Sequence, residues 1–243
     1  MAEELTIQEI VKQSNLNHVA FIMDGNRRWA KKQNMPTAIG HKKGVSSLKK
    51  VIKLAAEWNI KYITVYAFST ENWNRPKEEV SFLMNLLYKT LQTELNEMLQ
   101  KNVKIRIIGD LEPLDGKLRQ ILEDSMKKSQ NNDGVNLQIA INYGARNEIL
   151  QAVKKIAKKI EQNELKPEQL TEKEIENNLY TAGIPAPDLL VRTGGEYRIS
   201  NYLLWQIAYS EILITDKFWP EYDKEEFASN IKEFANRSRR FGA

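Results

Sequence analysis

The sequence predicts a single α/β domain with a mostly parallel, six-stranded central sheet flanked by helices. Short, β-rich apolar runs alternate along the chain with longer stretches of helical periodicity, which is typical of βαβ units. The chain of 243 residues contains no internal repeat and no low-complexity tract, and only the polar stretch 161–168 resembles a loop or linker. We therefore expect one domain over residues 1–243.

Six apolar runs predict the strands. They are short and mostly apolar enough to be covered on both faces, as strands of a parallel sheet are. The runs are 18–23, 62–68, 103–108, 135–142, 189–192 and 212–215. Connecting such strands in parallel requires a crossover between successive strands, which favours helices in the intervening segments.

Helical periodicity fills most of these intervening segments. In 42–58 and 145–160 the apolar residues recur on one face, so both helices are expected to be half buried. The apolar set of 78–100 is larger and predicts a helix with apolar neighbours on more than one side. Further helices are expected over 172–180 and 222–239, and 161–168 is expected to be a surface loop.

The composition excludes several kinds of chemistry. The absence of cysteine rules out disulfides, thiol catalysis and cysteine-based zinc sites. No window approaches 18 uncharged apolar positions, and the first residues lack a secretory signal, so we expect a cytoplasmic protein. The net charge of +4 and pI near 9.0 suit nucleic acid, an anionic membrane surface or a phosphorylated small molecule. Composition does not choose among these three.

The first predicted strand ends beside a carboxylate and dense positive charge. Ligands of open α/β sheets bind outside the carboxyl ends of the strands, so functional residues are expected in these loops. Asp24 and Gly25 form a turn sequence that leads into Arg27 and Arg28. A polar turn followed by a solvated basic run is an alternative interpretation. A phosphatase-like nucleophile would require a second aspartate where Asn26 stands.

The loop after the second strand gathers hydroxyl, amide, carboxylate and guanidinium groups. Helix capping accounts for Asn74 or Thr70 without a functional role. It does not account for Glu71, Asn72 and Arg75 together.

Two further segments contain groups that suit phosphate. His41 lies near the start of a predicted helix, where an anion is favoured, although a solvent-facing histidine is the plainer alternative. Arg192 and Arg198 flank a pair of glycines that allows the backbone to approach a ligand closely. Arginine also holds phosphate oxygens in a bidentate manner.

Arginines and carboxylates in one site predict a diphosphate bridged by a hard cation. The arginines bind phosphate directly, whereas the carboxylates would repel it unless a cation lies between them. Magnesium is the natural cation, because one or two carboxylates complete its coordination with phosphate and water. We expect Asp24 to be its main protein ligand. The residues concerned are Arg28, Arg75, Arg192, Arg198, Asp24, Glu71 and Glu211.

Several long motifs resemble the signature of bacterial undecaprenyl diphosphate synthases, which belong to the cis-prenyltransferases. They occur in order over nearly the whole chain, which makes them far more specific than any single motif. The leading motifs are Met23-Asp24-Gly25-Asn26-Arg27-Arg28-Trp29-Ala30, Gly40-His41 and Ala67-Phe68-Ser69-Thr70-Glu71-Asn72-Trp73-Asn74-Arg75-Pro76. The resemblance continues through 142–144, 190–196, 198–201, 205–206, 209–211 and 218–220.

The resemblance implies a magnesium-dependent condensation of isopentenyl diphosphate with an allylic diphosphate, farnesyl diphosphate being expected. The product would be a long-chain (Z)-polyprenyl diphosphate, undecaprenyl diphosphate for the lipid carrier of cell-wall synthesis. A homodimer with transient membrane-surface contact through its lipid product is also implied, with no binding of nucleic acid. A hydrophobic product tunnel would run along 78–100 and the strand around Leu137, although ordinary core packing predicts the same apolar pattern.

The resemblance also assigns roles to residues. Asp24 and Asn72 would be catalytic, and Asp24 and Glu211 would hold magnesium. The allylic diphosphate would lie against 25–28 and His41, and that of isopentenyl diphosphate against Arg192, Arg198 and Ser200. The complete implied substrate-binding set is Gly25, Asn26, Arg27, Arg28, Trp29, His41, Ser69, Thr70, Glu71, Trp73, Arg75, Arg192, Arg198, Ile199 and Ser200. The segment 240–242 resembles a carboxyl-terminal motif that reaches a substrate across the dimer interface.

The sequence departs from the family pattern at two positions. Arg27 replaces a glycine, and Thr37 replaces an arginine that contacts diphosphate. We hypothesise that Arg27 compensates for the arginine missing at position 37.

Other functions remain as alternatives. A shorter-chain synthase would use the same residues, whereas a non-catalytic scaffold subunit of this fold would have no need for Asp24 and Asn72. A nucleic-acid-binding module would require a basic stripe with exposed aromatic residues. A nucleotide-dependent enzyme would require a P-loop or a Gly-x-Gly-x-x-Gly motif, and the sequence contains neither of these two motifs. The absence of an Asp-Asp-x-x-Asp motif argues against a trans-prenyltransferase.

Overall fold

A six-stranded sheet with strand order β3-β4-β2-β1-β5-β6 forms the centre of the molecule. The computed structural model describes residues 5–237. Every neighbouring pair of strands is parallel, so the sheet is entirely parallel where a mostly parallel one was predicted. All six predicted strands are confirmed with small shifts at their ends, as β1 (His18–Ile22), β2 (Tyr62–Ser69), β3 (Lys104–Ile108), β4 (Asn136–Tyr143), β5 (Leu189–Thr193) and β6 (Glu211–Thr215).

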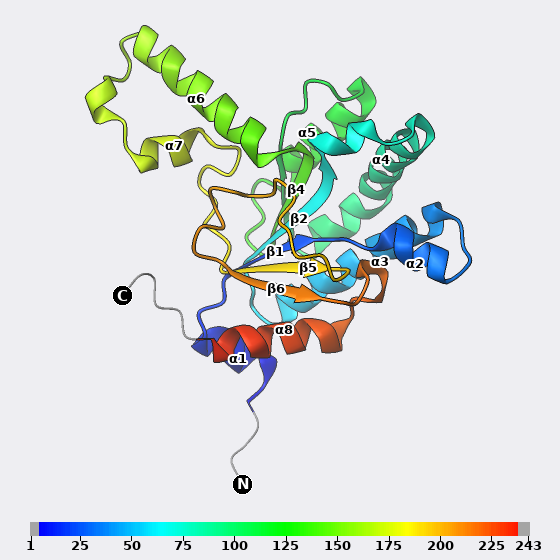
Figure 1. Cartoon of the computed structure of the whole chain (residues 1–243). Coiled ribbons are helices and arrows are strands. Elements are labelled where there is room, and N and C mark those ends of the chain that lie inside the picture. The colour runs from blue at the N-terminus through cyan, green and yellow to red at the C-terminus, as the bar shows by residue number, and fades with distance from the viewer. Residues whose placement is uncertain (1–4, 238–243) are drawn as a thin grey trace.

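Helices cover both faces of the sheet (Figure 1). The short helices α1 and α8 pack against each other below β6, and α6 and α7 lie together at the other side of the molecule. The helices are α1 (Ile7–Gln13), α2 (Asn26–Lys32), α3 (Thr37–Glu57), α4 (Lys77–Gln100), α5 (Gly116–Ser129), α6 (Ala145–Glu161), α7 (Glu172–Asn178) and α8 (Lys224–Asn236). None of the helices within residues 5–237 combines the length and apolarity needed to cross a membrane.

Alternate residues of the inner strands β1 and β5 point into two separate cores, whereas the edge strand β6 contributes only Leu213, to the larger core. Phe21, Leu137 and Val191 point into the larger core, to which α3, α4, α5 and α8 contribute. Ala20 and Leu190 point to the smaller core on the opposite face, which the segment 199–207 and the start of α6 cover. This burial on two faces explains why the inner strands appear in the sequence as continuous apolar runs.

Three helices were not predicted from the sequence, namely α1, α2 and α5. The sequence 26–32 was interpreted as the end of a turn and a basic run, but it forms α2, whose Ala30 is fully buried. Helix α5 hides its periodicity because Ser125 and Ser129 occupy its buried face. The hydroxyl of Ser129 accepts a hydrogen bond from the backbone nitrogen of Ile105 at 2.9 Å, which fixes α5 against β3.

The first long helix starts earlier than predicted, at Thr37 instead of position 42. Glycine normally weakens a helix, which is why the pattern favoured a later start. Here a side chain at Gly40 would stand 2.1 Å from the backbone oxygen of Asn26, and one at Gly44 would stand 2.4 Å from the Asn26 side chain. The glycines therefore allow α3 to pack directly against α2.

The remaining helices end close to their predicted bounds. The predicted helix 172–180 ends at Asn178, and the predicted helix 222–239 begins at Lys224, with its last two positions outside the described residues. The loop predicted over 161–168 is exposed and leads into a short 3-10 turn, η2 (Pro167–Gln169). Similar turns, η1 (Thr70–Asn74) and η3 (Trp219–Glu221), follow β2 and β6.

Candidate active site

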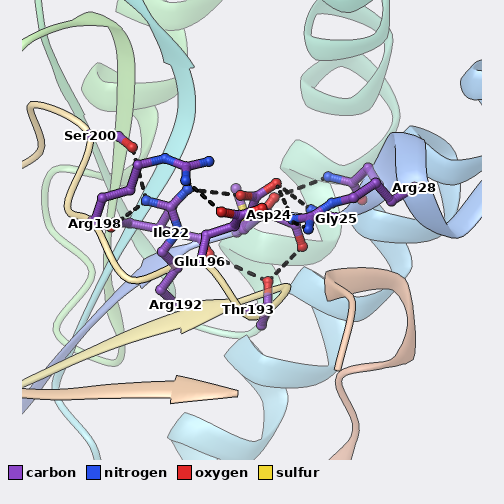
Figure 2. Close-up of polar contacts among 11 residues, drawn as sticks. Ile22, Asp24, Gly25, Arg28, Arg192, Thr193, Glu196, Arg198 and Ser200 are labelled. Carbon is purple, nitrogen blue, oxygen red and sulfur yellow. Dashed lines mark hydrogen bonds and ion pairs between the residues drawn. The ribbon is translucent and has the colours of Figure 1, made fainter. Parts of the chain in front are cut away.

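Asp24 lies where the carboxyl ends of the central strands meet (Figure 2). Its Oδ2 accepts a hydrogen bond from Nη2 of Arg192 at 2.8 Å, and its Oδ1 lies 3.3 Å from Nη2 of Arg28. The backbone nitrogen of Gly25 donates to Oδ1 at 2.6 Å. Burial alone would raise the pKa of Asp24, but the hydrogen bond from Arg192 and the charges of Arg192 and Arg28 lower it below its ordinary value. Asp24 is therefore an ionised carboxylate at neutral pH.

Arg192 connects Asp24 to the loop after β5. Its side chain is almost fully buried, and Nη1 donates to Oγ of Ser200 at 2.9 Å and to the backbone oxygen of Arg198. Nε of Arg192 is buried and has no hydrogen-bond partner within the described part of the chain. An arginine fork that binds a carboxylate on one side and a loop on the other fixes the two at a constant distance.

Glu196 bridges two exposed arginines at the rim of the site. Its carboxylate pairs with Nη1 of Arg28 at 3.0 Å and with Nη1 of Arg198. A hydrogen bond from Arg198 and the positive charge of Arg198 lower the pKa of Glu196 below its ordinary value. The chain can approach Arg28 this closely because Gly194 has φ +88° and a side chain there would stand 2.6 Å from Nη2 of Arg28.

The loop after β2 is held by its own polar side chains. Oδ1 of Asn72 accepts a hydrogen bond from the backbone nitrogen of Ser69 at 3.2 Å, and Ser69 is the N-cap of η1. Nε1 of Trp73 donates to Oδ1 of Asn142, at the end of β4, at 2.8 Å. The N-cap of α4 is Pro76, which makes no side-chain cap bond, so the capping interpretation of Asn74 and Thr70 is wrong.

A basic cavity of about 770 Å³ opens beside Asp24. Its lining combines the cationic side chains of α2 with His41 and Arg75, and it also includes Thr37. Burial, followed by the positive charge of Arg75, lowers the pKa of His41 to about 4, so this imidazole is neutral at pH 7. The cationic lining residues are Arg27, Arg28, Lys31 and Arg75.

Glu79, in the first turn of α4, lies behind these cations. Its carboxylate is 2.9 Å from Nη1 of Arg75, 3.5 Å from Nη1 of Arg27 and 3.9 Å from Nε2 of His41. The Glu79 side chain is only 13% exposed. One carboxylate therefore neutralises part of the positive charge of Arg27 and Arg75 and also lies close to the neutral imidazole of His41.

A second, mostly apolar cavity of about 710 Å³ runs between α4 and the sheet. It shares Met23, Asp24, Asn26, His41 and Arg75 with the basic cavity, so the two cavities meet at Asp24. Its apolar lining comes from α3, α4, β2 and β4 and includes Val45, Leu48, Phe68, Leu83, Met84, Leu86, Leu87, Leu91, Met98, Leu137 and Ile139. The volume lies in the range of ordinary ligand pockets.

Most of the predicted site residues lie around these two cavities. Ser69, Glu71, Asn72, Arg75, Arg192, Arg198 and Ser200 line the apolar one, and Gly25, Asn26, Arg27, Arg28 and His41 line one or both. Trp29, Thr70, Trp73 and Ile199 line neither cavity. Thr70 packs near Gly144, and Ile199 packs against the smaller core.

Glu211 lies away from this site. It opens β6 beside Leu189, three residues before the Arg192–Ile214 pair, which corresponds to about 10 Å along a strand. An offset of three also places Glu211 on the opposite face from Arg192. Its carboxylate accepts a hydrogen bond from Nη1 of Arg237 at 2.8 Å. The segment 240–242 lies outside the described residues.

Asp24 fits a magnesium site of a particular kind. Within residues 5–237 there is no cluster of three or more histidine or carboxylate side chains placed to hold a metal. Magnesium needs only one or two carboxylates when substrate phosphates and waters supply the remaining ligands. A single ionised carboxylate at the edge of a basic cavity therefore suits magnesium that is bound together with a diphosphate.

Sequence reasoning missed three residues that organise the site, namely Glu79, Glu196 and Asn201. Glu79 is four residues after Arg75 at a predicted helix start, a spacing that favours an ion pair. Glu196 and Asn201 stand inside the recognised motifs and were given no role. Their contacts come from distant segments, which no local pattern reveals.

Comparison with known proteins identifies relatives over nearly the entire chain. Residues 22–242 match the profile of a family described as putative undecaprenyl diphosphate synthase. The isoprenyl transferase of Oceanobacillus iheyensis is 46% identical over 93% of this chain and 90% of the relative. That of Geobacillus kaustophilus is 46% identical over 98% of this chain and 93% of the relative.

Solved structures agree with this assignment. Lavandulyl diphosphate synthase from Lavandula x intermedia, in complex with dimethylallyl diphosphate, has a TM-score of 0.92 at 35% identity, over 95% of this chain and 100% of that one. A probable undecaprenyl diphosphate synthase from Campylobacter jejuni has a TM-score of 0.79 at 37% identity, over 94% of this chain and 99% of that one. The chain belongs to the isoprenyl transferase (cis-prenyltransferase) family, which includes the undecaprenyl diphosphate synthases.

Proposed function

We propose that this enzyme is a magnesium-dependent cis-prenyltransferase that condenses isopentenyl diphosphate with farnesyl diphosphate. Its product would be undecaprenyl diphosphate, for use as the lipid carrier of cell-wall synthesis. The observation that carries this proposal is the meeting of a basic cavity and an apolar cavity at one ionised carboxylate, Asp24. An allylic diphosphate has a charged end for the first cavity and a hydrocarbon for the second.

The basic cavity supports binding of the allylic diphosphate. Arg27, Arg28 and Arg75 supply positive charge, and neutral His41 can donate one hydrogen bond to a phosphate oxygen. Asp24 would hold magnesium on the same diphosphate. When bound, the metal neutralises the negative charge that develops on the leaving group.

The loop after β5 supports binding of isopentenyl diphosphate. Arg192 and Ser200 are already hydrogen-bonded to each other, and Arg198 extends from the same loop with a side chain 58% exposed. The Arg198 guanidinium is thus available to a phosphate that enters from solvent. Because Arg192 also holds Asp24, the two diphosphates would lie on either side of one carboxylate.

In the proposed reaction the allylic C–O bond breaks and its diphosphate leaves as an anion. Arg27, Arg28 and His41 would stabilise this anion, which is electrostatic catalysis at the developing charge. The isopentenyl double bond then forms the new C–C bond with the allylic carbon, and one proton is lost to give a cis double bond. We assign this proton to a phosphate oxygen, because a neutral amide such as Asn72 is not a strong base. Asn72 would position the substrates.

The apolar cavity supports growth of a hydrocarbon chain. It begins at Asp24, where condensation would occur, and extends along α4 to Met98 and along β4 to Leu137. Each new unit would push the older part of the chain towards these residues. Product length would then depend on the side chains along α4.

The assembly and the cell compartment are further parts of the proposal. We propose a cytoplasmic homodimer that contacts the membrane surface transiently while it releases its lipid. Since Glu211 lies at the far end of β6 in its own subunit, we propose that any role in magnesium binding is exerted across the dimer interface, together with the segment 240–242.

A product assay tests this function. The purified protein is incubated with farnesyl diphosphate, radiolabelled isopentenyl diphosphate and magnesium, and the extracted lipid is sized by chromatography. We expect long-chain product that disappears with a chelator and with Asp24→Ala. A short product would instead support the shorter-chain synthase, and folded wild-type protein without product would support the scaffold function.

A further inference from the structure

A strained segment follows the last arginine of the site. Ser200, Asn201 and Leu203 have φ values of 49°, 59° and 48°, all in the left-handed region. Asparagine adopts this conformation with little difficulty, whereas serine and especially leucine adopt it rarely. Such strain persists only where surrounding contacts determine the backbone, and it is concentrated at functional sites.

The side chain of Asn201 supplies these contacts. Its Oδ1 accepts a hydrogen bond from the backbone nitrogen of Arg146 at 2.9 Å, and its Nδ2 donates to Oε1 of Glu71 at 2.7 Å. Its backbone oxygen also accepts a hydrogen bond from the nitrogen of Ala145 at 2.8 Å. One residue therefore ties the loop after β5 to the start of α6 and to the turn after β2.

The close approach of these segments depends on a missing side chain. A Cβ at Gly144 would stand 2.6 Å from Oγ1 of Thr70 and 2.8 Å from Nδ2 of Asn201. A side chain there would push the turn after β2 away from Asn201. The glycine, Thr70 and Asn201 thus form one packed junction next to Glu71.

The junction bears directly on the neighbouring residue Ser200. Oγ of Ser200 accepts a hydrogen bond from Arg192. The hydroxyl of Tyr66 lies within hydrogen-bond distance of two backbone oxygens, at 3.1 Å from that of Tyr143 and at 3.4 Å from that of Ser200. Burial would raise the pKa of Glu71, but the hydrogen bond from Asn201 helps to lower it, so Glu71 is ionised at neutral pH. The bond between Asn201 and Glu71 is therefore charge-assisted.

We propose that Asn201 is a positioning residue, whose carboxamide ties Glu71 to the strained segment 199–203 and so holds Ser200 and Arg198 in place for the diphosphate of isopentenyl diphosphate. This inference rests on the proposed function of the same site. Loss of the tie weakens binding of isopentenyl diphosphate. It leaves the contacts of the allylic diphosphate group unchanged, because Asn201 lines the apolar cavity and not the basic one.

Asn201→Asp removes only one part of the junction. Aspartate tolerates the left-handed backbone and still accepts from Arg146, but it presents an oxygen to Glu71 in place of the donor. We expect the KM for isopentenyl diphosphate to rise roughly tenfold, with a much smaller change in the KM for farnesyl diphosphate. Two adjacent carboxylates raise the pKa of one of them, so the ratio of variant to wild-type KM falls as the pH is lowered. Asn147→Asp, the same change on α6 at a residue outside the junction, is the matched control.

A double-mutant cycle separates the tie from a general loss of structure. Glu71→Gln lowers activity by itself, but it supplies a new amide donor for Asp at position 201. Asn201→Asp therefore raises the KM for isopentenyl diphosphate much less in the Glu71→Gln background than in the wild type. An equal cost in both backgrounds, or equal effects on the KM values of both substrates, overturns the inference.

Calorimetry keeps this outcome distinct from failure of the proposed function. Wild-type protein that binds isopentenyl diphosphate no better than Asn201→Asp overturns the inference alone. Folded wild-type protein that neither binds isopentenyl diphosphate nor forms product overturns the proposed function, and the inference falls with it.

Discussion

Arg27 and Thr37, the two residues expected to depart from the family pattern, both line the basic cavity. The Arg27 side chain is 58% exposed and lies 3.5 Å from Glu79. Its position is consistent with the hypothesis that it replaces the charge missing at Thr37. The hypothesis itself requires a kinetic test.

Arg27→Gly is expected to raise the KM for farnesyl diphosphate roughly three- to tenfold, because an exposed charge contributes modestly to anion binding. Adding Thr37→Arg to this variant restores the affinity if the two positions share one task. Steady-state kinetics of the wild type, Arg27→Gly and the double variant measure both effects. An unchanged KM in Arg27→Gly would show that the compensation hypothesis is wrong.

His18 predicts how stability depends on pH. It is 2% exposed, and burial lowers its pKa to about 4 from 6.5. Between about pH 6.5 and pH 4, the unfolded chain therefore binds a proton at His18 and the folded protein does not. The contribution of His18 to the free energy of unfolding falls as the pH falls through that window. The loss approaches about 3 kcal/mol at the acid end.

Urea unfolding of the wild type and His18→Gln at several pH values measures this effect. The variant is expected to show a shallower dependence below pH 6.5, while the other titrating groups act equally in both proteins. An NMR titration of the wild-type imidazole provides a check that requires no mutation. A His18 resonance that titrates near pH 6.5 would contradict the assignment.

At the scale of elements, helix α4 forms one wall of the apolar cavity. Met84 and Leu83 line that cavity, whereas Tyr88, one turn further along the same helix, packs against the core without lining it. The helix thus offers a matched pair of positions. A bulky side chain at position 84 is expected to fill the apolar cavity, whereas one at position 88 is not.

Met84→Trp is therefore expected to shorten the main product by one or more isoprene units, because the growing chain meets an obstacle. Tyr88→Trp, an aromatic replacement outside the cavity, leaves product length unchanged. Leu137→Ala, which removes a side chain from the opposite wall, lengthens it. Chromatographic sizing measures all three, and unchanged products from both Met84→Trp and Leu137→Ala would refute the proposed growth of the chain along α4.

The same elements show what sequence reasoning could and could not reach. The strands were predicted because they are short apolar runs, and β1 and β5 are buried on both faces along their whole length, whereas β6 at the edge of the sheet buries only Leu213. Helix α5 was missed because buried Ser125 and Ser129 replace apolar residues on its inner face. Motif resemblance gathered most of the lining of both cavities. It also suggested Glu211, although this residue directly precedes the predicted strand 212–215, and the structure places it at the amino end of β6.

Long-range contacts were the least predictable part of the site. Asn201 and Glu71 are 130 residues apart, and their hydrogen bond depends on the close approach of three loops. Glu79 lies close to Arg27 from α2 and to the neutral His41 from α3, as well as to Arg75 from its own segment. A pattern within one stretch of sequence contains no information about such partners.

At the scale of the whole molecule, β6 leaves one edge of the sheet unpaired within the described residues. Ile212 on this strand is 40% exposed, and the neighbouring Tyr209 is 73% exposed. Edge strands with apolar side chains are commonly covered by a partner. This surface supports the proposed homodimer.

Sedimentation equilibrium is expected to give about twice the chain mass of 28.2 kDa. Ile212→Asp weakens the dimer, because it places a charge in the apolar surface, and it lowers activity if Glu211 acts across the interface. Leu170→Asp, at a residue 42% exposed elsewhere on the molecule, is the control. A fully active monomer would contradict the proposed assembly.

The central claim is that the charged and hydrocarbon ends of one substrate occupy two cavities that meet at Asp24. A crystal structure with magnesium and an unreactive thio-analogue of farnesyl diphosphate tests it most directly. We predict the diphosphate among Arg27, Arg28 and His41, magnesium on Asp24, and the hydrocarbon between α4 and Leu137. A diphosphate bound elsewhere, or a hydrocarbon lying on the surface, would contradict the account.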